Sequence, residues 1–171
     1  FLLGQSLEHY RHSVNQVEEI TVVIKQYVLE RFEREYNLLI ELPGVSAIVA
    51  CVILSEIGPN VEAFKSQGNL ASWAGVCPGS YESAGIKKSS HTTQGNKYLK
   101  SILFQAGGTA GRSKDEAFHN LYARISGRSS KMKAIIACAH KMIRVIYKIL
   151  STGEHYDAKK ALGLRQQARA N

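Results

Sequence analysis

Apolar side chains recur at alternating intervals of four and three residues near the start of this chain. The series is Leu3, Leu7, Tyr10, Val14, Val17, Thr21, Ile24 and Val28, in which Thr21 alone is polar. A seven-residue repeat of this kind gives a helix one narrow apolar stripe, which suits a single partner helix. We therefore expect residues 1–36 to form a coiled-coil helix that makes a homo-oligomer through residues 3–28. The alternative is an ordinary helix folded back on its own chain.

Helical periodicity continues through most of the sequence. Pro43-Gly44 and Gly58-Pro59 bound an apolar helix over 47–57 with Ser46 as its N-cap, after a short apolar turn at 38–42. Apolar faces predict helices over 69–74, with Asn69 as cap and Trp73 in the core, and over 97–112, 115–125 and 131–152. Glycines in the second half of 97–112 allow close approach by another helix or by a nucleic-acid backbone. We expect an all-α fold with a compact helical domain at 37–156 and a short, frayed basic tail at 157–171.

The turn Leu42-Pro43-Gly44-Val45 joins two helical segments and is typical of a helix-hairpin-helix unit. Such turns offer backbone N–H groups at a helix N-terminus to a phosphate. Ser46 stands where the usual pattern has a second glycine, so the match is partial. Gly44 is a candidate phosphate contact, and a purely structural corner between helices is the alternative.

The stretch from Cys77 to Leu103 has no helical or alternating apolar period over its first part. A loop this long inside a compact chain is usually functional or disordered. Its polar part, residues 77–95, contains four serines and two threonines beside Lys87, Lys88 and His91, a combination that suits phosphate chemistry. Ser83 is the candidate nucleophile, with the three cations placed to neutralise charge. A solvated surface loop is the alternative.

The net charge of +8 is unevenly distributed along the chain. Residues 1–65 hold 5 Lys/Arg and 9 Asp/Glu, whereas residues 66–171 hold 17 Lys/Arg and 5 Asp/Glu. A region this basic usually meets a polyanion, because cations placed on phosphates release condensed counterions. Lys141, Arg144 and Lys148 share one helix face and predict a cationic stripe. Nucleic acid is therefore the expected partner, with a merely soluble basic surface as the alternative.

Three widely spaced cysteines offer neither a disulfide frame nor a Cys-x-x-Cys metal site. Cys51 and Cys138 lie in apolar runs and are expected in the core. This cysteine usage favours a reducing, cytoplasmic setting. No signal peptide and no apolar run long enough to span a membrane is visible. Histidines and carboxylates show no ligand spacing, so no metal site is expected within these 171 residues.

Several short motifs follow one another in a recognisable order. They are Leu42-Pro43-Gly44-Val45, Ser55-Glu56-Ile57-Gly58, Gly68-Asn69-Leu70-Ala71-Ser72-Trp73-Ala74-Gly75, Cys77-Pro78-Gly79, Glu82-Ser83-Ala84-Gly85 and Gln94-Gly95-Asn96-Lys97-Tyr98-Leu99-Lys100. Over residues 38–156 the chain resembles the C-terminal domain (Transposase 20) of insertion-sequence transposases related to the Piv and MooV DNA invertases. The resemblance implies a serine recombinase whose catalytic serine falls on Ser83, with Gly85 as the glycine of its motif.

The same resemblance implies partners and a second domain. Family members carry an N-terminal RuvC-like domain with a DEDD carboxylate set that binds divalent metal, and a coiled-coil segment leads from it. We expect that domain, with its Mg²⁺, to precede Phe1 in a longer protein, so that this fragment alone is inactive. Some members use a guide RNA encoded by the element. The expected DNA- or RNA-binding residues are Gly44, Gly85, Lys87, Lys88, His91, Asn96, Lys97, Lys100, Arg128, Lys141, Arg144 and Lys148.

The sequence thus predicts part of a DNA transposase in which Ser83 attacks a DNA phosphodiester. The alternative is a non-enzymatic helix-hairpin-helix module that binds nucleic acid, with Ser83 as an ordinary loop residue. A third reading, a coiled-coil dimerisation protein, predicts no salt-dependent binding to nucleic acid, whereas the other two predict a steep dependence.

Overall fold

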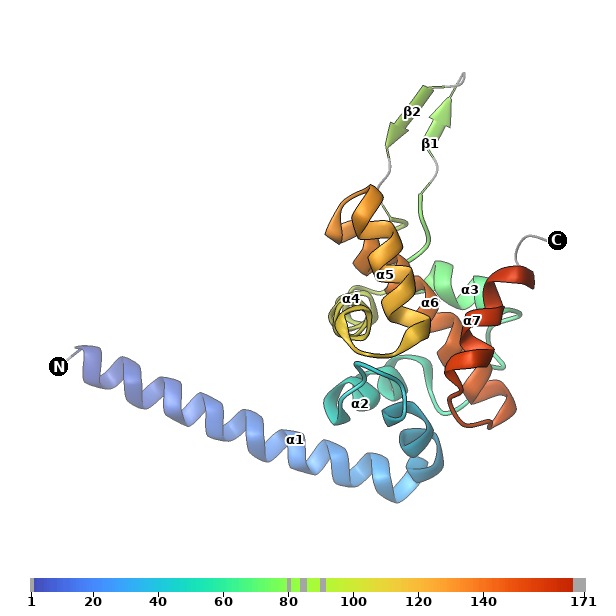
Figure 1. The fold of residues 1–171 in the computed structure, drawn as a ribbon. Helices are drawn as coiled ribbons and strands as arrows, with labels where there is room; N and C mark the ends of the chain where they lie inside the picture. Colours follow the sequence, from blue (N-terminus) through green and yellow to red (C-terminus); the bar gives the residue numbers. More distant parts are fainter. Residues whose placement is uncertain (1, 80, 84–85, 90–91, 168–171) are drawn as a thin grey trace.

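The computed structural model describes residues 2–79, 81–83, 86–89 and 92–167, and the side chains of residues 2–79 and 92–163. Helices make up nearly all of the regular structure, as an all-α fold requires (Figure 1). In chain order the elements are α1 (Leu2–Ile40), α2 (Ala47–Ile57), α3 (Gln67–Trp73), β1 (Tyr81–Ser83), β2 (Ile86–Ser89), α4 (Lys97–Arg112), α5 (Glu116–Arg128), α6 (Lys131–Thr152) and α7 (Ala158–Gln167).

Helix α1 has two parts with different surroundings. Its first part extends away from the helical body as an arm, and the chain bends where Phe32 leaves helical geometry at φ −138° and ψ 35° (Figure 1). After the bend, Tyr36, Leu38 and Leu39 are buried against the body. The apolar turn expected at 38–42 is therefore wrong for its first residues, since the helix continues to Ile40. Burial of Leu38 and Leu39 gives that last turn its stability.

Helix α6 is the centre of the body and packs against α3, α4 and α5. Its apolar face, which includes Met142, Ile143 and Ile146, is fully buried. The backbones of α4 and α6 approach each other closely at Gly107, where a Cβ atom would lie 2.7 Å from the backbone nitrogen of Ala139. The prediction that glycines in this helix allow close approach by another helix is confirmed.

Local capping explains where the helices begin and end. The predicted bounds of α4 and α6 are confirmed, with Asn96 and Ser130 as N-caps and left-handed Gly153 after α6. Ser46 caps α2 as expected. Helix α3, however, begins at Gln67 because Ser66, rather than Asn69, is its N-cap, and Trp73 is 40% exposed rather than in the core. Helix α5 runs on to Arg128, three residues beyond the predicted end.

The central stretch is not wholly irregular. Strands β1 and β2 form an antiparallel hairpin that projects from the helical body (Figure 1). The expectation of a long loop is therefore wrong for residues 81–83 and 86–89. Each strand is too short for an alternating pattern to be recognised in the sequence.

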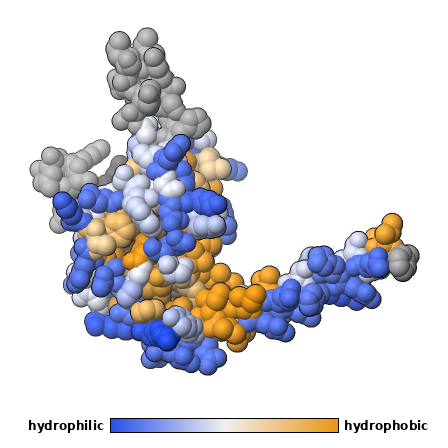
Figure 2. Space-filling model, turned by 180° about the vertical axis from the view of Figure 1, so that it is seen from behind, coloured by the Kyte–Doolittle hydropathy of each residue, from blue (hydrophilic) through white to orange (hydrophobic). Residues whose placement is uncertain are grey.

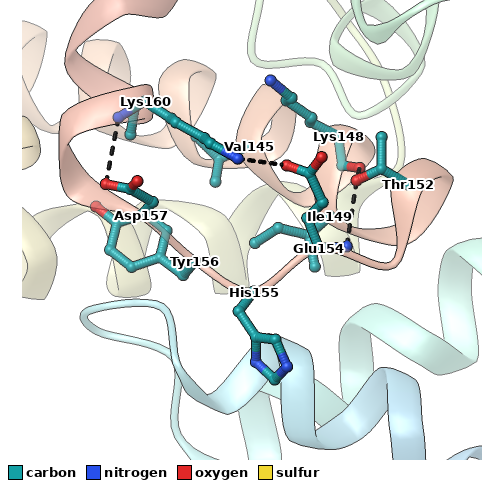
Figure 3. A pocket seen from close by; sticks show the side chains of 10 residues that line it. Val145, Lys148, Ile149, Thr152, Glu154, His155, Tyr156, Asp157 and Lys160 are labelled. Carbon is teal, nitrogen blue, oxygen red and sulfur yellow. Dashed lines mark hydrogen bonds and ion pairs between the residues drawn. The ribbon is translucent and has the colours of Figure 1, made fainter.

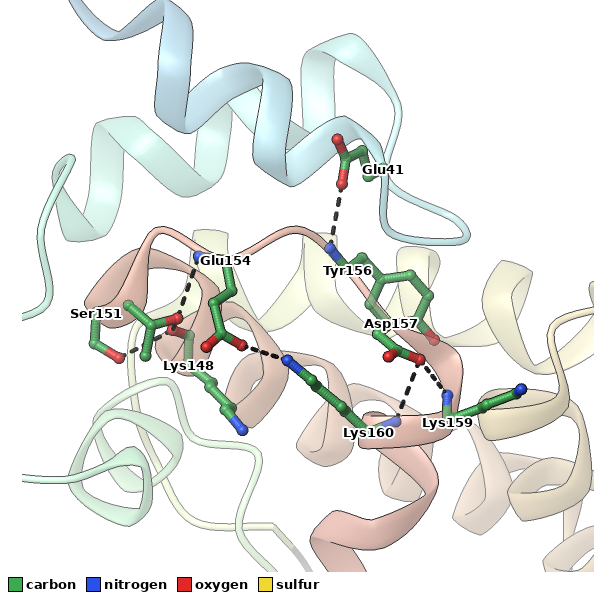
Figure 4. A network of polar contacts seen from close by, with 9 residues as sticks. Glu41, Lys148, Ser151, Glu154, Tyr156, Asp157, Lys159 and Lys160 are labelled. Atoms are coloured by element: carbon green, nitrogen blue, oxygen red, sulfur yellow. Dashed lines mark hydrogen bonds and ion pairs between the residues drawn. The ribbon is translucent and has the colours of Figure 1, made fainter.

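The C-terminal tail is helical as well, which corrects the expectation of a frayed end over much of its length. Ala161 of α7 is buried, and α7 packs against α5. The Asp157 carboxylate accepts hydrogen bonds from the backbone N–H groups of Lys159 and Lys160, so it satisfies donors at the start of this helix (Figure 4). Among the described residues, no helix is both long enough and apolar enough to cross a membrane.

Candidate nucleic-acid interface

Ser83 is the last residue of β1, and its Cα partner is Ile86, the first residue of β2. The next pair joins Glu82 to Lys87, and the register then shifts, which places Lys88 at an irregularity of the ladder. Ser83 is therefore at the end of the hairpin away from the helical body. Gly85 and His91, both predicted site residues, lie outside the described residues.

Below the hairpin, the two chain segments continue side by side as a stem. An isolated bridge pairs Pro78 with Thr92, and the N–H of Thr93 donates to the carbonyl of Cys77 at 3.0 Å. Lower down, the N–H of Asn96 donates to the carbonyl of Trp73 at 3.0 Å. The hairpin is thus attached to the body through two paired segments that run from α3 and into α4.

Two glycines close the foot of this stem. A Cβ atom on Gly95 would lie 2.6 Å from the Cα of Gly75, and Gly75 itself has φ +70°. A side chain at Gly95 would therefore push the two segments apart, and a side chain at Gly75 would strain the backbone. Glycine at both positions permits the contact that holds the stem closed.

Asn96 and Lys100, both predicted to bind nucleic acid, have structural partners in the stem. Asn96 Oδ1 accepts from the N–H groups of Tyr98 (3.0 Å) and Leu99 (2.9 Å), and its Nδ2 donates to a carboxylate oxygen of Glu56 in α2. Lys100 Nζ donates to the carbonyl of Thr93 at 2.9 Å. Both side chains therefore fix the stem relative to α2 and α4. No role for Glu56 is predicted from the sequence, although this residue belongs to the motif Ser55-Glu56-Ile57-Gly58.

Exposed cations remain at the same end of the body as the hairpin. Lys97, in the first turn of α4, is exposed, and its ammonium lies 4.9 Å from the ring centroid of Tyr98. Arg128, at the end of α5, is also exposed, and the α5–α6 connection lies at the hairpin end of the molecule (Figure 1). Lys87 and Lys88 belong to β2 itself. These four residues give the hairpin end a positive charge that the acidic first third of the chain lacks.

Lys141 does not share that exposed position. Its ammonium donates to the carbonyl of Ala117 at 2.8 Å and lies 5.4 Å from the ring centroid of Phe118, both in α5. Burial lowers the pKa of Lys141, and the nearby Asp115 carboxylate opposes this effect. Lys141 thus links α6 to α5.

The other two members of the predicted stripe have different neighbours. Arg144 is half-buried and lies near Cys77 and His140. Burial raises the pKa of the Cys77 thiol, and the Arg144 charge partly opposes this. Burial lowers the pKa of His140, and the Arg144 charge lowers it further. Lys148 is exposed and lies beside Glu154, whose carboxylate accepts a hydrogen bond from Lys160 at 2.9 Å (Figure 3). A small cavity of about 30 Å³ in this region is large enough for a water molecule and far smaller than a typical ligand pocket. The three cations share a face of α6 without forming one continuous exposed stripe.

Gly44, the predicted phosphate contact in the turn before α2, packs against α4. Its φ is +82°, and a Cβ atom there would overlap the carbonyl of Ala106 and lie 2.8 Å from the nitrogen of Ala110. Backbone conformation and close packing therefore account for the glycine without any ligand.

The cysteines and acidic residues offer little reactive chemistry. Cys51, Cys77 and Cys138 are free, and burial raises the pKa of each thiol, to about 11 for Cys138. Among the described side chains, no group of three or more His, Cys, Asp or Glu residues converges to hold a metal ion. The resemblance places its Mg²⁺ in the N-terminal RuvC-like domain, and none of these residues is assigned to it.

Comparison with known proteins gives consistent matches. A profile of the Transposase IS116/IS110/IS902 family matches residues 36–123, just over half of the chain. The chain is 31% identical to a Sinorhizobium fredii protein with a transposase name, y4pF/y4sB, over 87% of this chain and 39% of that protein. It is 28% identical to the 43.6 kDa protein of insertion element IS110 from Streptomyces coelicolor, over 77% and 32%. It is 27% identical to the pilin gene-inverting protein of Moraxella lacunata, over 89% and 48%. The chain thus spans between about a third and a half of the length of these relatives.

Proposed function

Because the chain belongs to the IS116/IS110/IS902 transposase family, we propose that it is the part of a DNA transposase or site-specific recombinase that supplies the serine nucleophile. A relative named for inverting a pilin gene supports DNA rearrangement as the reaction class. The observation that carries the proposal is the position of Ser83, at the end of a hairpin whose stem is fixed to the helical body.

The proposed chemistry is transesterification. The hydroxyl oxygen of Ser83 attacks the phosphorus of a DNA phosphodiester, and a phosphoserine bond forms as the bond to one deoxyribose oxygen breaks. The net proton passes from the serine hydroxyl to the released DNA hydroxyl. Attack by another DNA hydroxyl on the phosphoserine reverses the step and rejoins the strand, so the exchange needs no external energy source.

Binding of the DNA backbone is assigned to the lysines and arginine at the hairpin end. Lys87 and Lys88 lie on the same hairpin as Ser83, and Lys97 and Arg128 lie at the end of the body from which it projects. Phosphate contacts from Lys and Arg supply most of the salt-dependent affinity for DNA. We assign the phosphate contacts first to these four residues and to Lys148.

The remaining partners are also proposals. We propose that the chain acts with a metal-binding RuvC-like domain of a longer protein, and that two copies associate through residues 3–28. A guide RNA encoded by the element is a further proposed partner. The RuvC-like domain and the guide RNA rest on the family, and the association rests on the seven-residue repeat of α1. The assignment of Ser83 depends on none of the three.

The test is covalent trapping by full-length protein on element-end DNA with Mg²⁺. We expect a denaturation-resistant protein–DNA adduct with wild-type protein and with Ser89→Ala, a serine on the same hairpin, and no adduct with Ser83→Ala. An adduct that survives Ser83→Ala would assign the chemistry to another residue. Tight, salt-dependent binding without an adduct in any variant would favour a non-enzymatic nucleic-acid-binding module. Omission or addition of the element's RNA would show whether a guide is required.

A further inference from the structure

A large apolar groove lies where the arm of α1 meets the body. Its volume is about 510 Å³, and it is formed between the second half of the arm and α2. Its walls include Ile24, Val28 and Phe32 of α1 and Ile48, Cys51 and Val52 of α2. Figure 2 shows the corresponding hydrophobic surface at the base of the arm. The groove is thus an open apolar surface at the edge of the core.

The seven-residue repeat of α1 leads directly into this groove. Thr21, Ile24 and Val28 belong both to the repeat and to the groove lining. Further toward the N-terminus the repeat is uncovered, with Leu3 85%, Tyr10 66% and Val17 63% exposed. Among the described residues, no element covers the apolar seam along the first half of the arm. Exposed apolar surface of this extent marks an interaction site.

The charges beside the seam favour a second copy of the same helix in antiparallel orientation. Arg11 and Glu18 occupy equivalent flanking positions, one residue after Tyr10 and Val17 of the repeat. In an antiparallel pair, these flanking positions face each other, so that Arg11 of each copy meets Glu18 of the other. In a parallel pair, Arg11 would face Ser6 and Glu18 would face Ser13, which gives no ionic attraction. Flanking charges of this kind set helix orientation.

The antiparallel alignment that pairs Arg11 with Glu18 also places the apolar tip of one arm against the apolar base of the other. Val14 of one copy lies opposite Val17 of the other, and Leu7 lies opposite Ile24. Leu3 then lies opposite Val28, at the groove. Figure 2 shows that the tip and the base of the arm are the hydrophobic parts of its visible face, with a hydrophilic stretch between them. An antiparallel pair covers both ends at once.

We propose that two copies of this chain pair through antiparallel α1 arms, and that the N-terminal tip of each arm occupies the α1–α2 groove of the other copy. This interface rests on the self-association included in the proposed function and adds its orientation and its acceptor site. The two helical bodies then lie at opposite ends of a paired segment roughly 40 Å long, at 1.5 Å per helical residue. The hairpins that carry Ser83 therefore belong to bodies at opposite ends of the paired segment.

Engineered cysteines test the orientation. In a Cys51→Ala background, the double variant Leu7→Cys/Ile24→Cys is expected to form disulfide-linked dimers under mild oxidation, whereas Leu7→Cys alone and Ile24→Cys alone are not. Efficient dimer formation by either single variant would indicate parallel helices and overturn the proposal. A wild-type chain that is monomeric by light scattering would overturn it as well.

Charge reversal provides an independent test that leaves the seam intact. Arg11→Glu and Glu18→Arg each turn two attractions into two repulsions, so each should raise the dimer dissociation constant about tenfold at low salt. The double variant Arg11→Glu/Glu18→Arg should restore it, and Glu19→Arg, on the outer face, should leave it unchanged. Failure of the double variant to recover would contradict the antiparallel register.

The outcome is separable from that of the serine chemistry. Full-length protein that forms the Ser83 adduct but shows no antiparallel cross-link would overturn this interface alone. Protein that cross-links as expected but forms no adduct would support the interface and overturn the role of Ser83.

Discussion

The phenolic oxygen of Tyr156 donates to a carboxylate oxygen of Asp115 at 3.0 Å, across 41 residues of sequence. The other oxygen of Asp115 accepts from the N–H of Phe118 at 3.0 Å and so caps α5. The backbone N–H of Tyr156 donates in turn to Glu41 (Figure 4). This one tyrosine therefore connects the end of α1, the start of α5 and the segment before α7.

Tyr156→Phe should lower the free energy of unfolding by about 1–3 kcal/mol, because a hydrogen bond to a carboxylate is lost while the ring remains. Tyr98→Phe, at a residue 61% exposed, is the matched control and should change stability by less than about 0.5 kcal/mol. Urea unfolding followed by circular dichroism measures both. Equal effects would show that the Asp115 contact contributes nothing.

The same variant has a defined pH dependence. Burial, and then the hydrogen bond to Asp115, raise the pKa of Tyr156 above its ordinary value of 10.0. Because the folded-state pKa is the higher one, the stability that this tyrosine supplies is complete below pH 10.0 and declines as the pH rises above it. Wild type should therefore lose stability above pH 10.0 faster than Tyr156→Phe. A constant difference across that range would contradict the raised pKa.

Gly44→Ala should destabilise the fold by about 2–4 kcal/mol for two reasons. Alanine would be strained at the positive φ of this position, and its Cβ atom would overlap the backbone of α4. Gly127→Ala is the control. Gly127 is helical, and nothing lies within 4 Å of its added Cβ atom. That substitution should stabilise by roughly 0.5–1 kcal/mol. If Gly44→Ala instead kept full stability and weakened only DNA binding, the phosphate-contact hypothesis would be favoured over packing.

Asn96→Asp separates the two roles of Asn96, which caps α4 and donates a hydrogen bond to Glu56. Aspartate caps a helix as well as asparagine, but its carboxylate would face that of Glu56 and could not donate to it. We expect a loss of about 1–2 kcal/mol at neutral pH. Glu56→Gln should restore most of it in the double variant, because the glutamine amide can donate to the aspartate. A double-mutant cycle by chemical unfolding measures the coupling, and no coupling would mean that the contact contributes only the cap.

Lys141→Met should leave the salt dependence of DNA binding unchanged, because its ammonium is engaged by Ala117 and Phe118. Lys97→Gln and Arg128→Gln should each reduce the slope of log affinity against log salt by about 1. Lys65→Gln, an exposed lysine before α3, is the control for loss of one positive charge. Fluorescence anisotropy at several salt concentrations provides the slopes. An equal effect of Lys141→Met would mean that its ammonium leaves α5 when DNA binds.

Helix positions could be predicted from the sequence because their ends are encoded locally. Asn96 before α4 and Gly153 after α6 supply caps that need no distant partner. The neighbours of Lys141 could not be predicted, because periodicity places a side chain on a helix face without saying which helix packs there. The hairpin could not be predicted either, since its strands are short and its stem depends on Gly75 and Gly95, which are distant in sequence.

The contact between Gly75 and Gly95 has a consequence for how this protein can vary. The chain leaves the helical body at Gly75 and returns to it at Gly95, and these two residues are in contact. The packing of the helices therefore does not depend on how many residues lie between them. Closing a longer loop costs little additional entropy, because the cost grows only with the logarithm of length. The segment beyond Gly75 can therefore be lengthened, shortened or exchanged as a cassette while the helices that support it keep their packing. The length of the hairpin and the residues it presents to a partner can then change in evolution without altering the fold of the helical body. The two glycines mark where the variable segment begins and ends.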